Sequence, residues 1–180
     1  MRKSIREQLI GVSTDEREKQ AAHVVSVFES QSWMQKQVAV YVPLRTEFNV
    51  WPLFQTLEQK GANLWFPRCE ENGALTFRLG STQAALKWPK GIFGTHEPGE
   101  ELEQSSAFDL MFIPALIVHP ITGARMGYGK GFYDRSVPKI KVDCKVSVVY
   151  NFQLKEDWQP NEWDIRVNQI VTPSRIVNIK

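Results

Sequence analysis

The sequence predicts a single α/β domain over residues 1–180, built as three α/β/α layers around a mostly parallel central sheet. Short apolar runs, such as residues 38–42 and 63–67, alternate with helical patterns of ten or more residues, such as 49–60. The runs carry no polar alternation, which is typical of strands buried on both faces of a parallel sheet. The composition, 42% hydrophobic and 23% charged, is that of an ordinary globular protein.

Two helices are predicted ahead of the first strand. Residues 2–10 form a short basic helix. Ser13 and Glu16 have the spacing of a capping box, in which the serine side chain accepts a hydrogen bond from the first turn of the helix that it opens. The second helix repeats apolar residues at steps of three and four, which places them on one face. These residues are Ala21, Val24, Val25 and Phe28.

The next segment predicts a strand, a loop, a helix and a second strand. The first strand spans residues 38–42 and is followed by a loop over 43–48. Residues 49–60 have helical periodicity, and Gly61 is a suitable residue to end that helix. The second strand, residues 63–67, comes directly after it.

The rest of the chain continues the same alternation, with a long irregular stretch in the middle. Prolines and glycines between residues 89 and 99 predict a loop. A helix is expected from residue 132 to 137, where Pro138 interrupts it. Further strands are predicted at residues 74–79, 108–114, 145–150 and 170–172.

Charge and cysteine content exclude several classes of protein. Lys and Arg total 22 against 20 Asp and Glu, so the net charge of +2 provides no large cationic field for nucleic acid. Cys69 and Cys144 form neither a disulfide framework nor a zinc-binding spacing. We find no secretory signal and no apolar stretch long enough to span a membrane. We therefore expect a cytoplasmic protein with no membrane or nucleic acid partner.

A glycine-rich segment, residues 123–135, is the strongest local signal. Glycines let the backbone approach a ligand closely and point successive amides toward phosphate oxygens, and Arg125 and Lys130 add positive charge. The segment matches neither the P-loop nor the dinucleotide fingerprint. Without the charged residues, a flexible glycine turn would be the better interpretation. Asp134 is either a carboxylate at a helix start or a ligand of magnesium.

This segment resembles the signature of the 5-formyltetrahydrofolate cyclo-ligase family in the pattern Arg125-Met126-Gly127-x-Gly129-x-Gly131-Phe132-Tyr133-Asp134. The similarity extends over essentially the whole chain. Its other parts are the basic amino-terminal segment, a glutamate after the first strand, Phe66-Pro67-Arg68, Glu97-Pro98, Trp163-Asp164-Ile165 and Ile170-Val171-Thr172-Pro173.

The resemblance implies an ATP- and magnesium-dependent ring closure. In that family 5-formyltetrahydrofolate becomes 5,10-methenyltetrahydrofolate, and ADP and phosphate are released. The formyl oxygen attacks the terminal phosphoryl group of ATP, and a neighbouring folate nitrogen then displaces phosphate. Phosphoryl transfer of this kind depends on positioning and charge neutralisation, which a phosphate-binding loop with cations and a metal provides.

The resemblance also implies roles for individual residues. Arg125 and Lys130 are catalytic, Asp134 and Asp164 bind Mg²⁺, and small molecules are the only partners, with no obligate protein partner. The residues implied for ATP are Arg2, Lys3, Arg6, Arg125, Gly127, Tyr128, Gly129, Lys130, Gly131, Phe132 and Tyr133. Those implied for the folate are Glu47, Lys130, Phe132 and Tyr133, with Phe93 as a looser match.

Several of these residues also fit a purely structural interpretation. The basic residues near the amino terminus fit a solvated helix face, and Glu47 alone fits a surface carboxylate. Phe132 and Tyr133 alone would more often be core, and Asp164 also fits a loop aspartate that caps Arg166. His119 stands where the family has another pattern, and we interpret it as a local packing variation.

Two functional alternatives also remain. A phosphosugar- or acyl-transfer-type enzyme on a related α/β fold is the first, because fold does not fix reaction. A non-catalytic protein that binds folate or nucleotide is the second.

Overall fold

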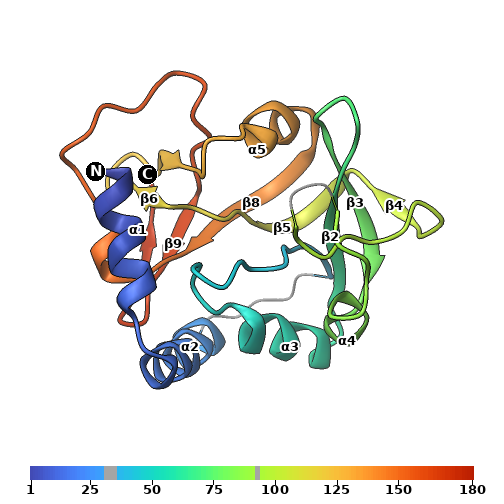
Figure 1. Cartoon of the computed structure of the whole chain (residues 1–180), viewed down its shortest axis with the longest axis horizontal. Coiled ribbons are helices and arrows are strands. Elements are labelled where there is room, and N and C mark those ends of the chain that lie inside the picture. The colour runs from blue at the N-terminus through green and yellow to red at the C-terminus, as the bar shows by residue number, and fades with distance from the viewer. Residues whose placement is uncertain (31–35, 92–93) are drawn as a thin grey trace.

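The computed structural model describes residues 1–30, 36–91 and 94–180. Its centre is an eight-stranded sheet with the order β10-β9-β8-β5-β1-β2-β3-β4 (Figure 1). The five adjacent strands from β9 to β2 run parallel to one another. Their bounds are β1 Gln37–Ala39, β2 Asn63–Cys69, β5 Ala107–Phe112, β8 Lys141–Val148 and β9 Gln169–Val171. The prediction of an α/β fold with a mostly parallel sheet is confirmed.

Antiparallel strands complete both edges of the sheet. On one side β3 (Leu75–Gly80) pairs with β2, and β4 (Gln104–Ser105) pairs with β3. On the other side β10 (Ile176–Asn178) pairs with β9. The sequence predicts β3 but neither β4 nor β10, because these two short edge strands contain no buried residue and form no continuous apolar run.

Most strand boundaries differ from the predicted ones by one or two residues, and the differences are larger at β1 and β8. The apolar run 38–42 predicts five strand residues, but β1 ends at Ala39. Val40 still donates a backbone hydrogen bond to Trp65 (2.8 Å), and the chain then leaves the sheet so that Tyr41 and Val42 line a cavity. At the other boundary β8 begins at Lys141, before the predicted residue 145, since its first half alternates in exposure instead of being buried on both faces.

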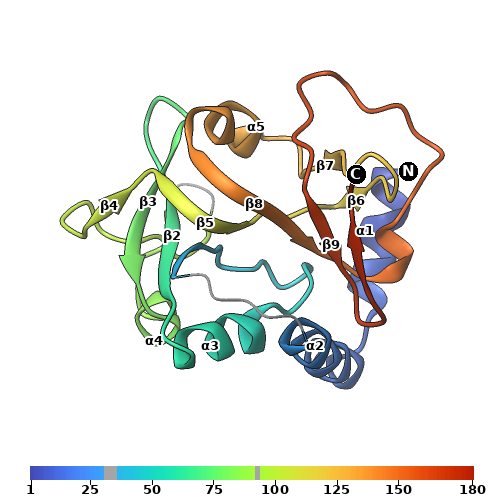
Figure 2. The ribbon, with the colours of Figure 1, turned by 180° about the vertical axis from the view of Figure 1, so that it is seen from behind.

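One face of the sheet carries α2 (Thr14–Glu29) and α3 (Trp51–Gln59), with the short α4 (Thr82–Ala85) near the β2–β3 edge. The helix α1 (Arg2–Gly11) runs from α2 along one end of the molecule (Figure 1). In Figures 1 and 2, α2 and α3 lie together on the side opposite α5. Their buried side chains share one core with the strands, where the Phe54 and Phe112 rings lie 5.1 Å apart and the Phe28 and Phe112 rings 5.8 Å apart.

The other face has a thinner layer. It consists of the five-residue helix α5 (Phe132–Ser136), the 3₁₀ turn η1 (Val137–Lys139) and a hairpin of β6 (Ile117–Val118) with β7 (Arg125–Met126). The helix expected over residues 132–137 ends at Ser136, because Pro138 supports a 3₁₀ turn at that point. Strand β7 was not predicted, since it lies inside the glycine-rich segment. A second 3₁₀ turn, η2 (Asn151–Gln153), follows β8.

Local signals at helix ends behave as the sequence predicts. The Ser13 hydroxyl accepts a hydrogen bond from the backbone N–H of Glu16 (3.2 Å), which opens α2. After α3 the backbone of Gly61 is left-handed, with φ of 90°, and this conformation ends the helix. Within the described ranges, no helix combines the length and the apolar character that crossing a bilayer requires.

Candidate functional site

A cavity of about 660 Å³ lies where the parallel strands end. Its walls come from the segment that follows β1, from the end of β2 and from residues 95–97. The glycine-rich segment with α5, and residues 161–164, complete them. Parallel strands bring their carboxyl ends to one edge of the sheet, so loops that are distant in the sequence meet at this point.

Most of the predicted site residues line this cavity. They are Arg2, Glu47, Arg125, Gly127, Tyr128, Gly129, Lys130, Gly131, Phe132, Tyr133, Asp134 and Asp164. Lys3 is exposed on α1 and does not line it. Arg6 also lies outside the lining, but its Nη2 donates to the carbonyl oxygen of Tyr128 (3.3 Å), so it supports the glycine-rich segment from behind. Phe93 lies outside the described residues.

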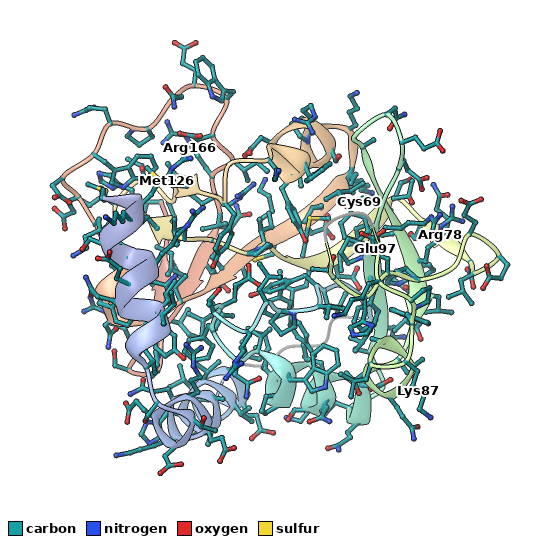
Figure 3. The ribbon with its side chains drawn as sticks, in the orientation of Figure 1. Cys69, Arg78, Lys87, Glu97, Met126 and Arg166 are labelled. Carbon is teal, nitrogen blue, oxygen red and sulfur yellow. The ribbon has the colours of Figure 1, made fainter. Side chains whose placement is uncertain are left out.

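Two groups of lining residues differ in character. We call Arg2 and residues 125–131 the glycine wall. We call Tyr41, Glu47, Cys69 and Glu97 the carboxylate wall. Figure 3 shows Met126, on the glycine wall, beside α1, and Cys69 and Glu97 near β2 and β3 on the other side of the molecule.

The glycines of the glycine wall permit guanidinium groups to approach the backbone. A Cβ atom at Gly127 would lie 2.6 Å from Nη1 of Arg125. Gly129 has φ of 98°, which favours glycine, and a Cβ there would lie 3.2 Å from Nη1 of Arg2. Arg2 is held further by its Nε, which lies 3.0 Å from the sulfur of Met126. The glycines therefore surround the backbone amides with positive charge, as an anion site requires.

Arg125 is a buried cation at the centre of the glycine wall. It is only 2% exposed, and its Nη2 lies 3.0 Å from Oδ1 of Asp134. Nη1 donates to the carbonyl oxygen of Pro114 (3.4 Å), and the guanidinium lies 5.4 Å from the ring centre of Tyr133. Burial lowers the pKa of Arg125, and the charge of Asp134 opposes that shift. The pair fixes the guanidinium beside the cavity.

The two predicted metal ligands both act electrostatically on this arginine. Asp134 uses Oδ1 for the ion pair with Arg125 and lines the cavity. Asp164 also lines it, accepts the backbone N–H of Asn161 on Oδ2 (2.7 Å), and acts electrostatically on the pKa of Arg125. It does not cap Arg166, whose Nη1 donates to the carbonyl oxygen of Thr122 (3.5 Å).

A metal held entirely by protein side chains is not supported. No group of three or more His, Cys, Asp and Glu side chains suited to a metal ion occurs in the part of the chain that the structure describes. Mg²⁺ usually takes only one or two carboxylates and completes its shell with phosphate oxygens and water. Two carboxylates beside an anion site fit that donor set.

Glu47 is buried on the carboxylate wall, which excludes the surface alternative. It is 8% exposed, and its Oε2 accepts the backbone N–H of Leu44 (2.7 Å). Burial raises the pKa of Glu47 to about 7, and the hydrogen bond from Leu44 opposes the rise. Arg17, which the sequence did not single out, donates from Nη1 to the backbone oxygen of Glu47 (3.0 Å) and from Nε to that of Val12 (3.1 Å). It therefore ties the Glu47 loop to the end of α1.

Three tyrosines lie around Glu47. Burial raises the pKa of Tyr41, Tyr128 and Tyr133, and the Glu47 carboxylate raises each of them further. The hydroxyls of Tyr128 and Tyr133 are buried without a hydrogen-bond partner among the described residues. Buried hydroxyls are normally paired, so these two are donors that a bound ligand can meet. Sequence reasoning did not identify Tyr41, which follows β1 with no motif of its own.

Two further residues with potentially reactive side chains are Cys69, which lines the cavity, and His119, which does not. Burial and the nearby Glu97 raise the pKa of the Cys69 thiol to about 12, so it is protonated at neutral pH and is not a nucleophile. His119 lies outside the cavity lining, and its Nδ1 accepts the backbone N–H groups of Ile121 (3.3 Å) and Thr122 (3.4 Å). It is a local turn-forming residue, in line with the expectation of a packing variation.

Comparisons with known proteins agree with this geometry. The model of the 5-formyltetrahydrofolate cyclo-ligase family matches residues 1–173. The NMR structure of Aquifex aeolicus 5,10-methenyltetrahydrofolate synthetase superposes with a TM-score of 0.84 at 30% identity, covering 99% of this chain and 91% of that one. The 5-formyltetrahydrofolate cyclo-ligase of Escherichia coli K12 is 29% identical over 79% of this chain and 81% of its own length. That of Mycolicibacterium smegmatis is 28% identical over 78% and 75%.

Proposed function

The chain belongs to the 5-formyltetrahydrofolate cyclo-ligase family, and we propose that it converts 5-formyltetrahydrofolate to 5,10-methenyltetrahydrofolate with hydrolysis of ATP to ADP and phosphate. The observation that carries the proposal is the cavity itself. One volume of about 660 Å³ joins a cationic glycine wall to a buried carboxylate, Glu47. Such a cavity suits a nucleoside triphosphate next to a flat ring that carries N–H donors.

The glycine wall suits the phosphates of ATP. Backbone amides of residues 127–131, with Arg2, Arg125 and Lys130, provide hydrogen-bond donors and positive charge for phosphate oxygens. Arg6 acts through the carbonyl of Tyr128 and holds this wall in place. Lys3 stays a prediction of the resemblance, because it does not line the cavity and no contact with the described residues explains the role.

The reaction needs positioned charge more than a protein nucleophile. The formyl oxygen of the folate attacks the terminal phosphorus of ATP, and the bond from that phosphorus to ADP breaks. The folate N10 then attacks the activated formyl carbon, phosphate leaves with the former formyl oxygen, and N10 loses its proton. Arg125 and Lys130 stabilise the negative charge on the transferring phosphoryl oxygens.

The carboxylate wall suits the pterin. The 2-amino group and N3–H of a reduced pterin are adjacent donors, and a carboxylate accepts both. Glu47 is the acceptor that we assign to this edge, because it is buried and held by Leu44 and Arg17. Phe132 and Tyr133 provide aromatic surface for the ring.

Asp134 and Asp164 are the residues that would hold Mg²⁺. Both line the cavity, and both act electrostatically on Arg125 of the glycine wall. With phosphate oxygens and water they make a donor set that Mg²⁺ accepts. The ion would neutralise charge on the phosphates when it is bound.

We further propose that residues 1–180 act as one catalytic domain in the cytoplasm, with small molecules as partners. Strands from both ends of the chain, β1 and β10, belong to the same sheet, which supports a single domain. Cys69 and Cys144 are both free thiols, which suits a reducing compartment.

A turnover assay tests the function. The purified protein is mixed with 5-formyltetrahydrofolate, ATP and Mg²⁺, and the methenyl product is followed by its absorbance. We expect turnover by the wild type, a loss of roughly 100-fold or more in Lys130→Ala at unchanged melting temperature, and wild-type rates in the control Lys139→Ala on the exposed turn η1. No product from folded wild type would favour a non-catalytic binding protein, and equal rates for both lysine variants would remove the role of Lys130.

A further inference from the structure

Glu97 has a buried carboxylate oxygen that no described residue pairs with. The residue is 5% exposed and lines the cavity. Its Oε2 accepts the backbone N–H of Cys69 at the end of β2 (3.2 Å), and Figure 3 shows the two residues side by side. Its Oε1 is buried and has no hydrogen-bond partner among residues 1–30, 36–91 and 94–180. Buried carboxylate oxygens are almost always paired, so an unpaired one beside a cavity points to a ligand.

The surrounding loop makes room for this carboxylate. A Cβ atom at Gly91 would lie 2.1 Å from Cδ of Glu97, so only glycine fits there without displacing the carboxylate. The backbone N–H of Glu97 donates to the carbonyl oxygen of Pro89 (3.0 Å), and that of Gly91 donates to Thr95 (2.8 Å). The position of the carboxylate is therefore built into the loop.

The cationic side chain next to Cys69 in the sequence, that of Arg68, is engaged elsewhere. Arg68 donates from Nη1 to the carbonyl oxygen of Pro98 (3.0 Å) and from Nη2 to Glu100 (2.5 Å). Among the residues that the structure places, Glu97 has no ion pair within 4.0 Å. The donor that meets Oε1 must therefore come from the cavity.

The position of Glu97 identifies which substrate supplies that donor. In Figure 3 it lies near β2 and β3, on the opposite side from Met126 and α1. The glycine wall, which we assign to phosphates, contains Met126 and Arg2. A carboxylate would also repel phosphate. Glu97 therefore faces the folate.

We propose, on the basis of the function assigned above, that Oε1 of Glu97 accepts a hydrogen bond from N8–H of the reduced pterin ring. Glu47 takes the 2-amino group and N3–H, which leaves N8–H as the remaining donor of the ring. In a fully oxidised pterin N8 carries a lone pair and no hydrogen, so the carboxylate repels it. Glu97 thereby makes the cavity selective for reduced over oxidised folates.

The test compares binding of two folates in the absence of ATP. Dissociation constants for 5-formyltetrahydrofolate and folic acid are measured with wild type, Glu97→Gln and the control Glu103→Gln, whose side chain is exposed. Glutamine keeps an oxygen for the Cys69 N–H and replaces Oε1 with an N–H donor. We expect Glu97→Gln to bind 5-formyltetrahydrofolate about 10- to 100-fold more weakly and folic acid as well as wild type or better. The control should change neither constant.

The binding measurements can overturn the role proposed for Glu97 in several ways. Unchanged binding of 5-formyltetrahydrofolate by Glu97→Gln, or equal weakening for both ligands, overturns the proposal. Wild type that binds ATP but no reduced folate refutes the proposed function, and this inference with it. Should Glu97→Gln fail to fold, wild type is compared with the 8-deaza analogue of 5-formyltetrahydrofolate, in which a methylene replaces N8–H. Equal affinity for the analogue and the parent compound then overturns the proposal.

Discussion

The glycine wall and the carboxylate wall differ in how the chain builds them. All of the glycine wall except Arg2 comes from one continuous segment, residues 125–131. The carboxylate wall takes Glu47 from the loop after β1, Cys69 from the end of β2 and Glu97 from a loop before β4. The first is a local motif that glycine conformations define, whereas the second exists only when the sheet is assembled. Substitutions in the two walls should therefore have separable effects.

The largest effect is expected at Arg125, which belongs to the glycine wall and also anchors it. Arg125→Ala leaves Asp134 without its partner and removes the buried charge of the glycine wall. We expect turnover to fall by roughly 1,000-fold and the free energy of unfolding to fall by roughly 3 kcal/mol. Absorbance assays and chemical denaturation measure the two losses. The exposed Arg175→Ala is the control, and a fully stable, fully active Arg125→Ala would contradict the buried pair.

An intermediate effect is expected at Glu47, on the carboxylate wall. Glu47→Gln removes one of the two acceptors assigned to the pterin edge and leaves the glycine wall intact. We expect affinity for 5-formyltetrahydrofolate to fall about 10- to 100-fold while ATP affinity stays unchanged. Calorimetric titration with each ligand separates the two constants, and the exposed Glu71→Gln serves as control. Equal losses for both ligands would show that the two walls are not independent.

The smallest effect is a dependence of folate binding on pH. The pKa of Glu47 is raised to about 7 by burial, and the ionised carboxylate is the form that accepts two hydrogen bonds. Affinity for 5-formyltetrahydrofolate should therefore fall by about tenfold from pH 8 to pH 6. Glu47→Gln should show a flat profile over this range. A flat profile in wild type would contradict the assignment.

The free protein should show the opposite dependence on pH. Since the native state binds the proton of Glu47 more tightly than the unfolded chain, the free energy of unfolding should fall as the pH rises from about 4.5 to about 7. Denaturation of the protein without folate over this range gives the sign of the change.

The sequence predicted most of the layers and much less of the edges. Apolar runs such as 108–114 identified strands of the parallel core, because burial on both faces requires a continuous apolar run. Strands β4 and β10 were not predicted from the sequence, since pairing with β3 and β9 rather than their own residues determines them. The interruption at Pro138 was predicted, but its outcome, a 3₁₀ turn after a five-residue helix, was not.

The candidate site was likewise predicted only in part. Residues 125–131 of the glycine wall were identified from their order in the sequence, whereas Arg2 came from the family resemblance. Glu47 came from the family resemblance alone, and its burial required the structure. Tyr41, Arg17 and the role of Glu97 were missed, because nothing near them in the sequence indicates what they contact.

By itself the sequence determined the α/β architecture and the position of the glycine-rich segment that we assign to an anion, because periodicity and backbone conformation depend on neighbouring residues. Only the tertiary structure decided that Asp134 pairs with Arg125 and that Glu47 and Glu97 line one cavity. The reason is the order of the strands. With β1 placed between β5 and β2, loops that lie far apart in the sequence end at the same edge of the sheet, and no local pattern encodes that neighbourhood.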